Sequence, residues 1–331
     1  MDRFSAGTAR VGFLFNPLSG RIRKRRDVLR RMLDGIPGAT RREVTNASEI
    51  NGSIDAFIRD DTDLLVIVGG DGTVQGALCH LFATQPLTNW PLLAIVPGGT
   101  TNMTALDLGH SGSPEQILQQ LKDSLLKRAL PALLQRHVLC IEQTGAVKVY
   151  GMFFGVGLIA RAVIFSRSPI KRLGITGEIY SGIITLGYLA GVLLGLRSGA
   201  WAPVQMSIME GDDERHHGSF AFLFASTLDR LLFGMRPYWG QEQEPLHITF
   251  VRQQQKHPLR SLMQLLSGGR NVLNDKNGYH SCNKRVLELL IDDDYIVDGE
   301  SYHAARERGP LRITAVGPVT FLAGSTSSVR S

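Results

Sequence analysis

Cysteine is scarce in this sequence. The chain has three cysteines among 331 residues, Cys79, Cys140 and Cys282, and none of them stands in C-x-x-C spacing. An odd number of scattered cysteines predicts neither a disulfide framework nor a zinc site. The chain also lacks a short repeat, and only 20% of its residues are charged, which excludes collagen-like, coiled-coil and wholly disordered classes. The length favours two domains of ordinary size.

Long hydrophobic runs are also rare. The first apolar run, Val11 to Phe15, is shorter than the core of a signal peptide, so we expect a cytoplasmic protein. The uncharged stretch from Ile179 to Leu196 is at the lower limit of a membrane span and contains glycines in G-x-x-x-G spacing. Its tyrosines, serine and threonine make it only moderately apolar. We therefore expect a buried or surface-docked helix at 174–196 that does not cross the bilayer.

Positive charge is in excess, with a formal net charge of +6, and it is concentrated near the N-terminus. The basic cluster Arg23–Arg31 contains Arg23, Lys24, Arg25, Arg26, Arg30 and Arg31. Such a cluster favours phosphates or an anionic membrane surface. A solvated helix face is the alternative. Nucleic acid is not expected, because no aromatic residues interleave with these arginines to stack on bases.

The first third of the chain alternates between two kinds of pattern. The segments Val11–Phe15, Leu64–Val68 and Leu92–Val96 are short, continuously apolar runs, which predicts strands buried on both faces. Helical apolar spacing separates them, at 28–33, 50–58 and 74–82. Strand and helix in alternation predict a parallel sheet with right-handed crossovers, whose ligands bind beyond the carboxyl ends of the strands.

Each of these strands ends in a loop of small residues. The loops are Asn16-Pro17-Leu18-Ser19-Gly20, Gly69-Gly70-Asp71-Gly72-Thr73 and Pro97-Gly98-Gly99-Thr100-Thr101-Asn102. Glycines let backbone N–H groups approach an anion, hydroxyls donate to phosphate oxygens, and the helix expected to begin at Val74 adds a partial positive charge. Any one loop could be an ordinary turn. Together the three predict a polyphosphate site.

The common nucleotide fingerprints do not explain these loops. The sequence has no G-x-x-x-x-G-K-[ST] motif, and Gly70, Gly72 and Gly76 are spaced one residue too widely for the dinucleotide pattern. The stretch Gly155–Ala160 does match G-x-G-x-x-A after an apparent strand. Its candidate ribose-binding acid, Glu178, begins a helical stretch instead of ending a second strand, which disfavours that reading.

The three loops, followed by Asp298-Gly299-Glu300, resemble the catalytic domain of the diacylglycerol kinase and sphingosine kinase superfamily, especially its bacterial lipid kinases. The resemblance covers most of the chain. Gly-Gly-Asp-Gly-Thr is shared with NAD kinases and, in related form, with phosphofructokinases. The combination of Pro-x-Gly-Thr-x-Asn with a late Asp-Gly-Glu is more specific to lipid kinases.

The resemblance implies an N-terminal α/β domain, with a parallel sheet flanked by helices, and a C-terminal antiparallel β-sandwich domain, with the active-site cleft between them. The corresponding ranges are 9–135 and 136–316, with a helical insertion at 174–196 and a tail, 317–331, that packs back on the first domain. Short apolar runs agree with strands in the second half. They lie at His137–Glu142, Val147–Phe154, Val204–Met209, Ser219–Phe224, His247–Val251, Val286–Ile291 and Leu311–Val316, separated by polar turns such as Glu210–Gly218.

The resemblance also implies site residues and cofactors. ATP as phosphate donor and Mg²⁺ are implied, and the matching nucleotide contacts are Asn16, Pro17, Leu18, Ser19, Gly20, Thr45, Gly69, Gly70, Asp71, Gly72, Thr73, Val74, Gln75, Gly99, Thr100 and Asn102. Glu300 and its acidic neighbour Asp298 match the catalytic residues. Asp71 is expected to orient the Mg-nucleotide or to share the proton-accepting role, since phosphoryl transfer needs charge neutralisation and a carboxylate near the attacking hydroxyl.

Together these observations predict an ATP-dependent lipid kinase that acts on a hydroxyl of a diacylglycerol-like or sphingoid-like lipid. We expect it at the inner face of the membrane, associated peripherally through the basic cluster. A homodimer is a further expectation. An NAD kinase-like enzyme is one alternative, although the Asn-Glu pair of its nucleoside-binding loop is not found. A non-catalytic nucleotide- or lipid-binding protein is the other, and the intact Asp71, Asp298 and Glu300 argue against it.

The sequence departs from the family pattern at two places. Met103 follows the last Asn of the third loop, where family members often have Asp. An accessory metal seen in some bacterial members needs Asp-Gly before a strand resembling Pro245–Val251, and the chain has Gln243-Glu244 there, so we do not predict that metal. The acidic run Asp292–Asp294 is expected to be a solvated hairpin turn.

Overall fold

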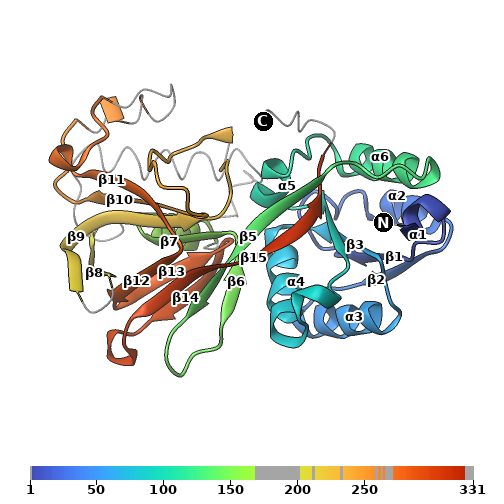
Figure 1. Cartoon of the computed structure of the whole chain (residues 1–331), viewed down its shortest axis with the longest axis horizontal. Coiled ribbons are helices and arrows are strands. Elements are labelled where there is room, and N and C mark those ends of the chain that lie inside the picture. Colours follow the sequence, from blue (N-terminus) through green and yellow to red (C-terminus); the bar gives the residue numbers. More distant parts are fainter. Residues whose placement is uncertain are drawn as a thin grey trace. The chain divides into compact units, whose positions relative to one another are not determined.

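The structure is a computed structural model that describes residues 2–167, 202–210, 213–231, 234–257, 260–261, 264 and 271–324. The chain divides into two compact units (Figure 1). The N-terminal unit comprises 1–136 and 317–331, and the C-terminal unit comprises 137–316. The helix expected at 174–196 and the last residues of the tail lie outside the described residues. No helix in the described part of the chain is long and apolar enough to cross a membrane.

A parallel sheet forms the centre of the N-terminal unit. Its strands are β1 (Val11–Phe15), β2 (Ala39–Glu43), β3 (Leu64–Gly69) and β4 (Leu92–Pro97), in the order β2-β1-β3-β4. The end of β15 (Leu311–Leu322) adds a further parallel strand, with Phe321 opposite Leu93. The three strands expected from apolar runs are confirmed. We missed β2, because its sequence ATRRE reads as polar and forms a partly exposed edge strand.

Helices cover both faces of this sheet (Figure 1). α2 (Arg26–Asp34) and α6 (Pro114–Leu126) pack on one face, where Leu29, Leu33 and Ile117 join Phe13 and Val66 in a buried cluster. α3 (Ala47–Arg59) and α4 (Asp71–Thr84) lie on the opposite face. Gly12 permits that packing, since a Cβ at this residue would lie 2.6 Å from the Phe57 ring. Two short helices, α1 (Asp2–Ala6) and α5 (Met103–Asp107), and the 3-10 turn η1 (Leu87–Asn89) complete the unit.

Antiparallel strands form the C-terminal unit. Those before the helix α7 (Leu158–Arg167) are β5 (Leu133–Glu142), β6 (Val149–Gly151) and β7 (Phe153–Gly157). After it come β8 (Val204–Glu210), β9 (Asp213–Ser226), β10 (Leu246–Arg252), the turn η5 (Asp275–Asn277), β11 (Tyr279–Lys284), β12 (Val286–Ile291), β13 (Asp293–Val297), β14 (Glu300–Ala304), the turn η6 (Arg306–Arg308) and β15.

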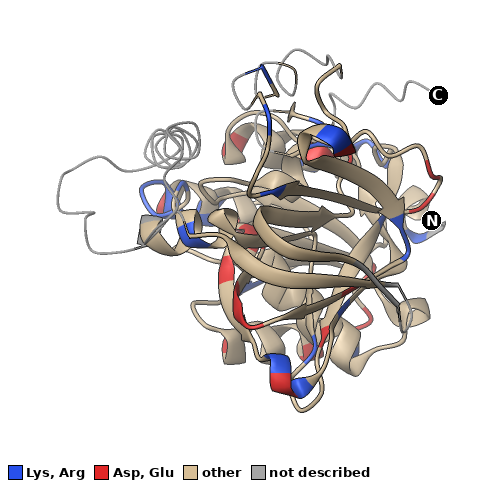
Figure 2. Cartoon of the chain, turned by 90° about the vertical axis from the view of Figure 1, so that its left-hand side faces the viewer, with Lys and Arg blue, Asp and Glu red and all other residues tan. Residues whose placement is uncertain are grey.

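The strand order in this unit is β14-β13-β7-β9-β8-β12-β15, and β9 also pairs with β10, which pairs with β11. Figure 2 draws most strands in tan, and the sequences of β10 and of the second half of β9 contain few charged residues. The expected fold class, a helix-flanked parallel sheet followed by antiparallel strands, is confirmed.

Two expectations for the second half were wrong in detail. The single strand expected at Val147–Phe154 is divided at Met152 into β6 and β7. Most of the polar turn expected at Glu210–Gly218 belongs to β9, whose hairpin with β8 already pairs Glu210 with Asp213. Alternation of polar residues on a solvated strand face looks like a turn in the sequence. We missed β11 and β14 for the same reason.

The acidic run Asp292–Asp294 is also corrected. Asp293 and Asp294 belong to strand β13, which pairs with both β14 and β7. The carboxylate of Asp293 lies 2.7 Å from the guanidinium of Arg161 on α7. This acid therefore ties a helix to the sheet, where we expected a solvated hairpin turn.

Candidate active site

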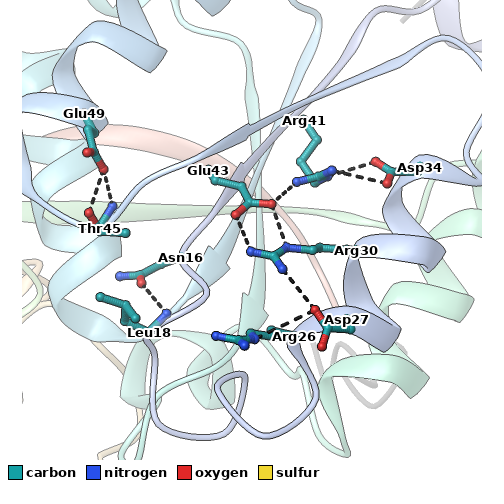
Figure 3. A network of polar contacts seen from close by, with 10 residues as sticks. All are labelled: Asn16, Leu18, Arg26, Asp27, Arg30, Asp34, Arg41, Glu43, Thr45 and Glu49. Atoms are coloured by element: carbon teal, nitrogen blue, oxygen red, sulfur yellow. Dashed lines mark hydrogen bonds and ion pairs between the residues drawn. The ribbon is translucent and has the colours of Figure 1, made fainter.

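The first of the three small-residue loops begins at Asn16, directly after β1. The Asn16 side chain holds the loop in shape, since its Oδ1 accepts the N–H of Leu18 at 3.0 Å (Figure 3). Its Nδ2 donates to Oγ1 of Thr73 at 2.9 Å, and Oγ of Ser19 accepts the N–H of Gly70 at 3.2 Å. The first and second loops are thus joined by their own polar side chains.

The second and third loops also touch through their backbones. The N–H of Gly98 donates to the carbonyl of Gly69 at 2.6 Å. A Cβ on Gly70 would lie 3.0 Å from Cα of Gly99, and a Cβ on Gly99 would lie 2.8 Å from Cα of Gly70. Glycine is the only residue without a Cβ, so Gly70 and Gly99 are both required for this close approach of the two loops.

Asn102 closes the third loop. Its Oδ1 accepts the N–H of Gly99 at 2.7 Å, and its Nδ2 donates to the carbonyl of Gly99 at 2.8 Å. Asn102 itself adopts the left-handed conformation, with φ of 51°, which Asn tolerates better than most residues. The structure therefore brings all three loops together at the carboxyl ends of β1, β3 and β4, as the strand pattern predicted.

Asp71 lies at the centre of this arrangement and is the first residue of α4, which begins three residues earlier than expected. Its carboxylate accepts hydrogen bonds from the backbone N–H groups of Asn102, Met103 and Thr104 at the start of α5. Burial raises the pKa of Asp71 to about 6, and these N–H groups oppose the rise without cancelling it. The pKa of the Asp71 carboxyl therefore lies between that of an ordinary aspartate and neutral pH.

A single carboxylate suits the binding of Mg²⁺ together with a nucleotide. Mg²⁺ prefers oxygen ligands, keeps several waters, and is typically bound through one or two carboxylates plus the phosphates of a nucleotide. In the described part of the chain no three His, Cys, Asp or Glu side chains gather into a metal cluster. The residues present therefore fit Mg²⁺ carried in by a nucleotide, with Asp71 as the protein oxygen donor.

Three of the predicted nucleotide contacts, Val74, Gln75 and Thr45, also have structural roles within the unit. The side chains of Val74 and Gln75 are buried, so these two residues lie in the interior of the unit beside the loops. The N–H and Oγ1 of Thr45 both donate to one carboxylate oxygen of Glu49, at 2.6 and 2.8 Å (Figure 3). This is a capping arrangement at the start of α3, where the side chain of Asn46 accepts the N–H of Glu49.

The late Asp298-Gly299-Glu300 motif forms the turn between β13 and β14. Asp298 and Gly299 have φ values of 47° and 89°, and the flanking Val297 and Glu300 are paired across the hairpin. The Asp298 side chain is buried, and its carboxylate accepts the N–H groups of Met152 and Phe153. Glu300 is the first residue of β14 and is partly exposed. Met152 and Phe153 are site neighbours that sequence reasoning missed, since backbone donors leave no signal in the residue types.

The basic cluster of the N-terminal unit is only partly free of partners (Figure 3). Arg30 binds the carboxylates of Asp27 and Glu43, and Arg41 binds those of Asp34 and Glu43. The hydrogen bond from Arg30 holds the pKa of Glu43 below its usual value. Arg25 pairs with Glu115 at 3.0 Å, whereas Arg23 and Lys24 are exposed. The acids of this network follow no motif, and the packing of α2 beside β2 brings Glu43 to Arg30 and Asp34 to Arg41.

Comparison with solved structures shows which fold class this is. A crystal structure of a protein from Bacillus anthracis str. Sterne, provisionally assigned as a diacylglycerol kinase, matches with a TM-score of 0.66 at 17% identity, over 96% of this chain and 95% of that one. A crystal structure of a diacylglycerol kinase from the same organism matches with a TM-score of 0.62 at 14% identity, over 96% of this chain and 97% of that one. At such identities the likeness establishes the two-unit fold.

The sequence match is more specific and covers the phosphate loops. Residues 10–131 match the sequence model of the diacylglycerol kinase catalytic domain. A comparison with curated proteins finds no match. The resemblance inferred from the loops is therefore confirmed for residues 10–131.

Proposed function

We propose that this protein is an ATP-dependent lipid kinase, which transfers the γ-phosphate of ATP to a hydroxyl of a diacylglycerol-like or sphingoid-like lipid. The observation that carries the proposal is the junction of the three loops around Asp71. Glycines and small polar residues form this junction in place of large side chains. Phosphoryl transfer relies on positioning and on neutralising phosphate charge, and loops of this kind supply both. The family match in the same segment supports the class of reaction.

In this proposal each group has a separate task. The phosphates are bound by the start of α4 and by N–H groups of the second and third loops other than those of Gly70, Gly98 and Gly99, which bind within the protein. Mg²⁺, when bound with the nucleotide, neutralises charge on the phosphate oxygens, and Asp71 orients that complex. Glu300 accepts the proton of the lipid hydroxyl. An ionised Asp71 is the major form at neutral pH, because its pKa of about 6 lies below that pH.

The proposal also includes attachment to an anionic membrane through the basic cluster. Arg30 and Arg41 are engaged with acids, so the side chains best placed to meet lipid headgroups are the exposed Arg23 and Lys24. Leu18, which is 57% exposed in the adjoining loop, adds an apolar side chain to this surface. Juxtamembrane basic residues contribute about 1 kcal/mol each to binding anionic lipid.

The decisive experiment is phosphoryl transfer itself. Purified full-length protein is incubated with γ-labelled ATP, Mg²⁺ and a panel of lipid alcohols in mixed micelles, with NAD⁺ as a separate acceptor. We expect label in at least one lipid and none in NAD⁺. Label in NAD⁺ alone would replace the lipid kinase with an NAD kinase-like enzyme, and binding of ATP without transfer to any acceptor would support a non-catalytic binding protein.

A further inference from the structure

The turn that carries Glu300 has an unusual and well-defined backbone. Asp298 and Gly299 are two successive residues with positive φ, 47° and 89°, between the paired residues Val297 and Glu300. Two-residue hairpin loops with positive φ at both positions are type I′ turns, which match the twist of the flanking strands. Asn-Gly and Asp-Gly are the sequences that this turn prefers. The turn therefore determines where β14, and with it Glu300, begins.

The carboxylate of Asp298 points into the protein. It is bound at the junction between β6 and β7, where its Oδ1 accepts the N–H of Phe153 at 2.9 Å and of Met152 at 3.2 Å. Its Oδ2 lies 3.0 Å from the same Met152 nitrogen. The N–H of Asp298 in turn donates to the carbonyl of Phe153 at 3.0 Å. Backbone and side chain of one residue thus fasten the turn to the neighbouring strand.

Gly151 makes room for this attachment. A Cβ on Gly151 would lie 2.7 Å from Oδ2 of Asp298 and 2.5 Å from Cγ1 of Val297, both closer than real Cβ contacts allow. Gly151 has no positive φ that would require glycine at this position. The close approach of the Asp298 side chain explains why residue 151 is glycine. The space at Gly151 and the N–H groups of Met152 and Phe153 together hold the carboxylate.

We propose that Asp298 is a positioning residue, which fixes the turn so that Glu300 is presented to the lipid hydroxyl, and that it is not itself a proton acceptor. The inference rests on the proposed function and specifies how the same site is divided between its two acids. The Asp298 carboxylate is bound at the β6–β7 junction and holds the turn in place, which is the task of a positioning residue. Glu300, partly exposed at the start of β14, remains the acid that can meet substrate.

Isosteric substitution separates the two roles. In Asp298→Asn a single Oδ1 keeps both N–H bonds, and Asn-Gly is a favoured type I′ sequence. We expect this variant to retain kcat within about tenfold, with KM for ATP little changed. Asp298→Ala loses the bonds and places alanine at positive φ, so kcat should fall by about 100-fold, the effect of displacing a reacting group by about 1 Å. A proton acceptor would lose as much on conversion to Asn as to Ala.

Gly151→Ala provides an independent test, because it displaces the Asp298 carboxylate without altering it. We expect this variant to lower kcat as Asp298→Ala does, while near-ultraviolet circular dichroism shows a folded protein. Gly145→Ala is not a suitable comparison, since Gly145 has positive φ of 71°. Gly52→Ala serves as the control, because nothing lies within 4 Å of its added Cβ. It should retain full activity.

The outcomes distinguish this inference from the proposed function. If Asp298→Asn loses activity to the level of Glu300→Gln, or if folded Gly151→Ala keeps wild-type kcat, the positioning role is wrong. If Asp298→Ala does not fold, the comparison of Asp298→Asn with Gly151→Ala still decides. A wild-type chain that phosphorylates no lipid would overturn the proposed function instead, whatever the variants do.

Discussion

Two aspartates, one in each unit, both accept backbone N–H groups, yet their surroundings differ. Asp71 begins a helix and receives N–H groups from the start of α5, and burial raises its pKa to about 6. Asp298 lies in a turn with positive φ and receives N–H groups from Met152 and Phe153. The first is a carboxylate kept close to protonation among loops suited to phosphate. The second fastens the turn between β13 and β14 to the junction of β6 and β7. Two aspartates that both belong to sequence motifs therefore have different surroundings and different structural roles.

The largest expected effect concerns the acid that follows the second aspartate. Glu300→Gln should lower kcat by about 10² to 10⁴, the usual contribution of general acid–base catalysis, with a smaller change in KM for ATP. Steady-state kinetics at varied ATP measure both constants. A change confined to KM would assign Glu300 to nucleotide binding. The N-terminal and C-terminal units would then no longer differ in the task proposed for their acids.

Asp71→Asn tests the other side of the comparison. We expect phosphoryl transfer to fall by at least about 100-fold, because charge neutralisation and positioning carry most of this catalysis. The melting temperature should not fall, because the amide avoids the cost of burying a charge and its Oδ1 still accepts N–H groups. Turnover and thermal denaturation of the same preparation measure the two effects. Near-normal turnover would make Asp71 a structural residue of the turn.

The pH dependence of stability sharpens the same test. The pKa of Asp71 is raised from 3.8 to about 6 on folding, so the folded state binds more protons than the unfolded state between these values. The ionised carboxylate therefore destabilises the fold above pH 6, and this cost disappears as pH falls toward 4. Urea unfolding should show Asp71→Asn more stable than wild type at pH 7.5, by on the order of 1 kcal/mol, and the difference should shrink by pH 5. A constant difference would contradict the raised pKa.

The glycine contact between the second and third loops has a matched pair of variants. Gly99→Ala places a Cβ 2.8 Å from Cα of Gly70, whereas the Cβ of Gly52→Ala, in the middle of α3, meets nothing within 4 Å. We expect the first to destabilise by about 1–3 kcal/mol, as overpacking does, and to raise KM for ATP. The second should stabilise by about 0.5–1 kcal/mol. Equal denaturation midpoints for the two variants would mean that the loops do not pack as described.

Membrane binding separates paired from exposed basic residues within the N-terminal unit. Arg23→Gln/Lys24→Gln should weaken binding to anionic vesicles by about 10- to 30-fold at low salt, at about 1 kcal/mol per residue. The difference from wild type should diminish as salt rises. Arg59→Gln/Lys127→Gln removes two exposed basic residues elsewhere and is the control. Equal weakening in both double variants would indicate that net charge, not this surface, governs binding.

The sequence alone determined much of the N-terminal unit. Continuous apolar runs predicted β1, β3 and β4, and the small residues after each strand predicted where an anion site would form. The strand prediction succeeded, and the loops after these strands meet, because strand burial and loop geometry both depend on local residue types. The same reasoning missed β2, whose charged residues Arg41 and Glu43 pair with Asp34 and Arg30 of α2. Val74 and Gln75 stay predicted nucleotide contacts, and their side chains are buried.

Tertiary structure alone decided the roles of the acids. The residue type Asp is the same at 71, 293 and 298, and each is found in a motif or an acidic run. Only the fold brings backbone N–H groups to Asp71 and Asp298 and a guanidinium to Asp293. Burial and hydrogen bonding fix the proton affinity and orientation of a carboxylate, and both are set by neighbours that are distant along the chain.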